Sequence, residues 1–125
     1  MKVNIQIRND ESGYIYEVLA FFNDDLVGSI LLGKLSKDFD GQYIKYAKVI
    51  SEANYGQGIG TQMYDALLKY CRNNKIRLFR QKHPTIGALK VWQKLEPFGI
   101  TYKERPDLMS THHELEVILE NYSGL

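Results

Sequence analysis

Residues 54–71 read NYGQGIGTQMYDALLKYC, and this stretch joins a glycine-rich loop directly to an apolar helix pattern. Glycine adopts backbone angles closed to other residues and lets another molecule approach the peptide N–H groups closely. The first turn of a helix has N–H donors without helical acceptors and carries a partial positive charge. The stretch is therefore suited to bind a phosphate group, although a tight turn whose glycines serve packing alone predicts the same pattern.

The residues that follow the loop are spaced as one buried face of a helix, which Asn73-Asn74 would end. The members of this face are Ile59, Met63, Ala66, Leu67, Tyr70 and Cys71. Because Cys71 is on this face, we predict that it packs in the core, with a role as nucleophile as the alternative. A single cysteine cannot form an internal disulfide.

Four extended runs precede the loop. Residues 3–7 alternate apolar and polar side chains, residues 14–22 are rich in aromatic and branched side chains, and further runs cover 26–35 and 43–50. The connections between them are short, with turn residues such as NDESG and DG, which predicts an antiparallel meander.

The remainder of the chain alternates between strand and helix signals. The predicted elements are a strand at 76–80, a helix at 84–95 and strands at 99–103 and 113–120. We therefore predict a single α/β (α+β) domain over residues 1–125. Its sheet is mixed, mostly antiparallel, with about seven strands flanked by helices in the order ββββ-α-β-α-ββ.

The composition is that of an ordinary soluble domain: 125 residues, 44% hydrophobic, 25% charged, with a net charge of +1. This balance disfavours nucleic acid and membranes as main partners, and the start MKVNIQIRNDESG has no apolar signal segment, so we expect a cytoplasmic protein. A local basic run is interpreted as a solvated rim. It consists of Arg72, Lys75, Arg77, Arg80 and Lys82.

Two well-known phosphate loops do not fit the glycine stretch. A nucleotide hydrolase loop needs a lysine after its last glycine, and here Thr61 follows Gly60. A dinucleotide fold has its glycine turn early, with an acidic residue ~20 positions later, where this chain has Arg80. The pair His112-His113 lacks metal-ligand partners at any recognised spacing, so we expect no metal.

With this order of elements, the chain resembles the GNAT superfamily of acyl-CoA N-acyltransferases. The family loop (Gln/Arg)-x-x-Gly-x-(Gly/Ala) lies between a strand and a helix, and KVISEANYGQGIGTQMYDALLKYC is similar to it, with Tyr55, Gly58 and Gly60 at its fixed positions. A second family stretch resembles TIGALKVWQK followed by FGI.

The resemblance implies that acetyl-CoA is the acyl-donor substrate and that the loop amides bind its pyrophosphate. Lys90 and Lys94 are candidates to meet the outer phosphate, although an exposed helix edge explains them equally well. The implied cofactor-binding residues are Val49, Ile50, Tyr55, Gly56, Gln57, Gly58, Ile59, Gly60, Thr61, Thr85, Ala88 and Trp92.

The resemblance also implies direct attack of an amine on the thioester carbonyl, with a main-chain N–H near Val49 or Ile50 stabilising the oxyanion. Glu52, after that strand end, and His83, after the fifth strand, are candidate bases. A surface carboxylate and a turn or capping histidine are the alternative interpretations. We list Ile50, His83 and Glu52 as candidate catalytic residues.

Three features depart from the family pattern. Tyr55 replaces the usual Gln or Arg; Trp92 occupies the place of a tyrosine that protonates the thiolate in many members; and residues 9–13 leave no room for the helices that usually roof the acceptor site. An indole cannot supply that proton, although a thiol of pKa ~8.5 leaves as a thiolate without one. Tyr46 and Tyr64 are either core residues or proton relays.

We therefore predict an N-acetyltransferase that acts on a primary amine. The missing roof suggests a protein side chain or N-terminus as acceptor, or a homodimer whose second subunit closes the site. The alternatives are a non-catalytic CoA-binding or protein-interaction module with a GNAT fold, and a β-rich partner-binding domain that never binds CoA.

Overall fold

The computed structural model describes residues 1–36, 40–105 and 115–125. The elements follow the predicted order, with two short 3-10 helices, η1 and η2, in addition. They are β1 (Asn4–Asn9), β2 (Ile15–Phe22), β3 (Asp25–Lys34), β4 (Gln42–Val49), η1 (Glu52–Asn54), α1 (Ile59–Asn74), β5 (Leu78–Arg80), α2 (Ile86–Leu95), η2 (Glu96–Phe98), β6 (Thr101–Glu104) and β7 (Leu115–Ile118).

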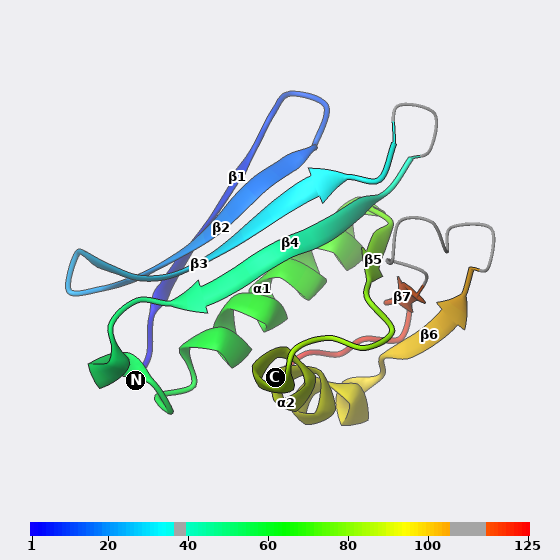
Figure 1. The fold of residues 1–125 in the computed structure, drawn as a ribbon. Helices are drawn as coiled ribbons and strands as arrows, with labels where there is room; N and C mark the ends of the chain where they lie inside the picture. The colour runs from blue at the N-terminus through cyan, green and yellow to red at the C-terminus, as the bar shows by residue number, and fades with distance from the viewer. Residues whose placement is uncertain (37–39, 106–114) are drawn as a thin grey trace.

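The strands form one seven-stranded sheet in the order β1-β2-β3-β4-β5-β7-β6 (Figure 1). Every neighbouring pair is antiparallel except β4 and β5, which are parallel because α1 connects them as a crossover. The predicted mixed, mostly antiparallel sheet is confirmed. The start of α2 differs slightly from the prediction, because Thr85 caps the helix and Pro84 precedes it.

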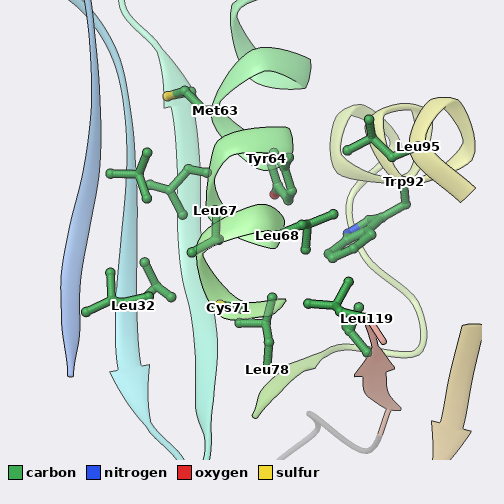
Figure 2. Packing of buried hydrophobic residues seen from close by; sticks show 14 of the residues in the cluster. Leu32, Met63, Tyr64, Leu67, Leu68, Cys71, Leu78, Trp92, Leu95 and Leu119 are labelled. Carbon is green, nitrogen blue, oxygen red and sulfur yellow. The ribbon is translucent and has the colours of Figure 1, made fainter. Parts of the chain in front are cut away.

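The helix α1 lies across one face of the sheet and packs against β1 to β4 (Figure 1). Gly28 in β3 permits this approach, since a Cβ there would lie 2.9 Å from Cε of Met63 and 3.0 Å from Cγ2 of Ile59. Further along α1, Leu68 meets Trp92 of α2 and Leu119 after β7 (Figure 2). Cys71 is buried in this core and free, as its place on the apolar face predicts.

The opposite face of the sheet is exposed along its central strands. In β2, Ile15 and Val18 are fully buried, whereas Tyr16 is 50% exposed; Tyr46 in β4 is 51% exposed. Aromatic and branched residues on both faces of β2 suggested a central strand. The strand is indeed internal to the sheet, but only its α1 face is covered by a helix among the described residues.

A tight hairpin joins β1 to β2. Oδ1 of Asp10 accepts hydrogen bonds from the backbone N–H groups of Ser12 and Tyr14, at 2.9 and 3.0 Å. Gly13 adopts a φ of +91°, which glycine tolerates. The connection therefore contains no helix, as predicted from the shortness of residues 9–13.

The C-terminal tail is fixed to α1 through a buried carboxylate. Asp65 accepts hydrogen bonds from the Tyr122 hydroxyl at 2.7 Å and from the Leu125 N–H at 3.1 Å. Lys69 forms an ion pair with it at 3.0 Å. Burial opposes ionisation of this carboxyl, but these donors together hold the pKa of Asp65 below its ordinary value.

Neither helix of the described ranges has the length and apolar character needed to cross a bilayer. Within those ranges no group of His, Cys, Asp or Glu is arranged to hold a metal ion. The pair His112-His113 and the first two residues of the predicted strand at 113–120 lie outside the described residues.

Candidate functional site

A cavity of about 640 Å³ opens between β4 and the two helices. Its wall includes the outer part of β4 (residues 44–49), the glycine loop with the first turn of α1 (residues 54–61), the end of β5 at Arg80 and Gln81, and one face of α2. The cavity therefore joins the loop that the sequence selects to the strands that flank it.

The cavity exists because β4 and β5 separate. The two strands pair only at Gln42 with Leu78 and at Tyr43 with Phe79, within the described residues. β5 is three residues long and then leads into α2, while β4 continues to Val49. Among the residues that the structure describes, one edge of the outer half of β4 is consequently left without a neighbouring strand.

The direction of the backbone groups on this edge follows from one hydrogen bond. The Ile50 N–H donates to the Val27 carbonyl oxygen at 2.8 Å, across to β3. In an antiparallel ladder, bonded and non-bonded pairs alternate, so Val49, paired with Gly28, points its N–H away from β3 and into the gap. Of the two N–H groups that the sequence analysis offered as oxyanion donor, Val49 and Ile50, that of Ile50 is therefore already occupied.

The loop places a helix N-terminus at one end of the cavity. Gly58 is the N-cap of α1 with a left-handed φ of +78°, and Gly56 has a φ of +75°. No side chain caps the helix, and its first turn has no acidic residue. The first helical bond is that of the Gln62 N–H to the Gly58 carbonyl; the N–H groups of residues 56–61 donate to no acceptor in the described part of the chain.

The glycines of the loop leave space in front of these donors. A Cβ at Gly56 would meet nothing within 4 Å, and one at Gly58 would meet only Nε2 of Gln62, at 3.9 Å. Gly60 has a different surrounding, because its Cβ position lies 3.6 Å from Cγ2 of Val91 in α2. The first two positions thus open onto the cavity, whereas Gly60 sits where the helices approach each other.

Gln62 anchors the loop to the N-terminal segment, a role that the sequence analysis missed. Its side chain accepts from the Val3 N–H at 3.0 Å and donates to the carbonyl oxygens of Met1 and Gly58. A glutamine in a helix has no sequence signal for such a role, because the partner segment is 59 positions away.

On the α2 side, the side chains have mostly structural partners. The Thr85 hydroxyl accepts from the Ala88 N–H at 3.3 Å, so it caps α2. Trp92 is buried and packs edge-to-face with Tyr64 at 5.4 Å between ring centroids. All four of these residues nevertheless border the cavity, as do Lys90 and Lys94.

Arg80 departs from the sequence interpretation. The solvated basic rim was predicted to include it, but it is only 8% exposed. Its guanidinium carbon lies 5.1 Å from the ring centroid of Trp92 and 4.5 Å from that of Tyr102. The aromatic rings that bury it lie 12 and 22 positions further along the chain, so the local charge pattern could not reveal this environment.

The two candidate bases lie outside the cavity wall. Glu52 and His83 are exposed, and neither is among the described residues that line the cavity. Ile50 is absent from the same wall, whereas Val49, Tyr46 and the loop residues Tyr55 to Thr61 belong to it.

Tyr64 borders the cavity as well, but its hydroxyl is poorly suited to relay a proton near neutral pH. Burial raises the pKa of Tyr64 to about 12, and the nearby Arg80 charge offsets this only in part.

Known proteins support the same interpretation of the chain. The sequence profile of the acetyltransferase (GNAT) family matches residues 2–96. No curated protein sequence matches the chain.

Solved structures share the fold. An acetyltransferase from Bacillus subtilis in complex with CoA has a TM-score of 0.58 at 13% identity, with 93% of this chain and 95% of that chain covered. Tetrahymena GCN5 has a TM-score of 0.61 at 13% identity, covering 87% and 71%. For a GNAT-family acetyltransferase from Staphylococcus aureus the TM-score is 0.53 at 19% identity; the match covers 81% of this chain but only 65% of that one. Because the family profile covers most of the sequence, the chain belongs to the GNAT family of acetyltransferases.

Proposed function

We propose that this protein transfers an acetyl group from acetyl-CoA to a primary amine, which attacks the thioester directly. The observation that carries the proposal is the set of N–H groups of residues 56–61, which have no acceptor within the described residues and border the cavity. Such a helix N-terminus favours a phosphate group both through its donors and through the helix dipole.

The cavity fits an extended cofactor. The pyrophosphate would bind the loop amides, and the pantetheine arm would follow the free edge of β4, where backbone groups of Ala47 and Val49 point into the gap. Lys90 and Lys94 border the same cavity and are available to an outer phosphate. Thr85, Ala88 and Trp92 would form the wall on the α2 side.

The Val49 N–H is our candidate for the oxyanion donor. It replaces Ile50 in this role, because the Ile50 N–H is bonded to Val27. An oxyanion donor contributes about 2.7–4 kcal/mol of transition-state stabilisation in characterised enzymes. A backbone donor also explains why the side chain at this position carries no functional signal.

The amine must lose a proton before it attacks. A lysine-like amine has a pKa of ~10.4, so its neutral form costs about 4.6 kcal/mol at pH 7. Since Glu52 and His83 do not line the cavity, we assign this proton to solvent water that enters the open side of the cavity.

The proposal also covers the kind of acceptor and the cellular compartment. The uncovered face of the sheet and the hairpin in place of roofing helices support a bulky acceptor, such as a protein side chain or N-terminus, or closure by a second copy of the chain. The free, buried Cys71 is compatible with the cytoplasm, where thiols stay reduced.

Calorimetric titration with CoA, followed by thiol release from acetyl-CoA with a panel of amines and proteins, tests the function. Binding with turnover is expected. Binding without turnover would favour the non-catalytic module instead. A bound cofactor at 100 times its Kd stabilises the fold by about 2.7 kcal/mol, so an unchanged melting temperature in millimolar CoA would contradict both.

A further inference from the structure

Arg80 carries a positive charge and is buried. Its Nε and Nη1 atoms are buried and have no hydrogen-bond partner in the described part of the chain. Within the described residues, Arg80 forms no ion pair, in contrast to Arg77, which binds Glu116 at 2.8 Å. A buried charge is costly unless it is paired, so this side chain calls for an anionic ligand.

The two rings around Arg80 fix its orientation and leave Nε and Nη1 without a hydrogen-bond acceptor among the described residues. The guanidinium group lies over the faces of Trp92 and Tyr102, and such stacking does not consume the donors at its edge. Arg80 also borders the cavity. An anion that enters the cavity can therefore approach a positive charge that is held in place before it arrives.

The place of Arg80 in the sheet indicates which anion this is. The last β4–β5 pair joins Tyr43 to Phe79, so Arg80 is the first residue of β5 beyond the point where the strands separate. The loop amides at the other end of the cavity already supply donors for the pyrophosphate. In the proposed function the pantetheine arm follows the free edge of β4, so we place its thioester at the gap beside Arg80, where cleavage creates a negative charge on sulfur.

We propose that Arg80 binds the coenzyme A thiolate as it leaves, an inference that rests on the proposed function. The amine lone pair forms the C–N bond, the electrons of the C–S bond pass to sulfur, and the proton of the new amide goes to water. The thiolate remains paired with the guanidinium group and is protonated by water on release. Arg80 thus takes over by charge the task that Trp92 cannot perform as an acid.

The titratable and charged groups around this thiol come from several elements. Burial raises the pKa of Tyr64 on α1 to about 12 and also raises that of Tyr102 on β6, with Glu96 of η2 contributing. Burial likewise raises the pKa of Cys71, the only cysteine, to about 12. The other charged or titratable groups that face the cavity are Lys45, Tyr46 and Lys48 on β4, Tyr55 on the loop, and Lys90 and Lys94 on α2.

The test measures the thiolate of bound CoA by its ultraviolet absorbance as a function of pH, with the protein in excess. In the wild type, we expect the bound thiol to titrate at least one pH unit lower than in Arg80→Met, which is a tenfold difference in ionisation ratio. Arg80→Lys should retain part of the shift. Lys82→Met is the matched control, since Lys82 is a nearby cation outside the cavity wall that pairs with Glu104; it should behave as the wild type.

A second measurement needs only the wild type. Between pH 6 and pH 9, the affinity for CoA should rise about tenfold relative to that for desulfo-CoA, which lacks the thiol. Equal pH profiles for the two ligands, or equal thiol titration in the wild type and Arg80→Met, would overturn the inference. The inference would also be overturned if Arg80→Met weakened only the binding of acceptor amines that carry a carboxylate, because Arg80 would then bind the acceptor and not the thiolate. Failure of both ligands to bind would instead refute the proposed function, and this inference with it.

Discussion

The backbone N–H of Ile50 donates to the carbonyl oxygen of Val27 at 2.8 Å, and this bond sets the direction of the backbone groups of β4 from Val49 back to the register shift at Lys45. It turns the Val49 N–H into the gap between β4 and β5. Because β5 separates from β4 after Phe79, this edge of β4 is free, among the described residues, to bind an extended ligand along the cavity.

Val49→Pro tests the oxyanion donor. Proline removes the N–H that faces the gap and leaves the bonds to β3 in place, so kcat should fall about 10²–10³-fold while CoA still binds. Val49→Ala keeps the N–H and should remain within about threefold of the wild-type kcat. Ile50→Pro loses the bond to Val27 and should lower the melting temperature more than Val49→Pro does. Wild-type turnover by Val49→Pro would place the donor elsewhere.

Gly58→Glu tests the loop. The substitution puts a side chain and a negative charge in front of the helix N-terminus, so the Kd for CoA should rise about 100-fold, which is about 2.7 kcal/mol. Gly58 adopts a φ of +78°, which strains any other L-residue, so part of any loss of stability in Gly58→Glu comes from this strain. Gly13→Glu is the control, because Gly13 also has a positive φ and open space but lies in the β1–β2 hairpin. Equal CoA affinity in the two variants would rule out the loop as the binding site.

Glu52→Gln and His83→Asn test the bases suggested by the sequence. Both residues are exposed and outside the cavity wall, so each variant should keep kcat/KM within about threefold of the wild type, with an unchanged pH–rate profile. A loss of about 10²-fold or more in one variant, with CoA affinity preserved, would restore that residue as the general base.

Asp65→Asn tests the anchor of the C-terminal tail. Because the folded state holds the pKa of Asp65 below its unfolded value of ~3.9, the carboxylate stabilises the fold above that pH, and this stability is lost as the pH falls through the lower, folded value. We expect a loss of about 1–3 kcal/mol at pH 7. Thermal melts should show this difference shrinking as the pH falls below about 4; a difference that does not shrink at any acidic pH would contradict the assignment.

The sequence predicted the fold because its signals are local. Alternating side chains mark β1, the helical spacing from Ile59 to Cys71 marks α1, and the turn residues between them set the order of elements. The loop was found for the same reason, since three glycines at a helix start have a direct conformational meaning.

The details of the site depend on distant contacts. Whether Val49 or Ile50 points its N–H into the gap is a matter of one residue of register, and pairing with β3 decides it. The burial of Arg80 depends on rings from α2 and β6. Neither relationship leaves a trace in the residues next to these positions.

The most direct test of the account is the response of the loop amides to CoA. In ¹H–¹⁵N spectra, we predict that the backbone signals of Gly56, Gly58 and Gly60 shift on addition of CoA, and that adenosine without phosphates leaves them in place. If CoA binds while these signals do not move, the donors at the start of α1 do not hold the pyrophosphate, and the proposed site is wrong.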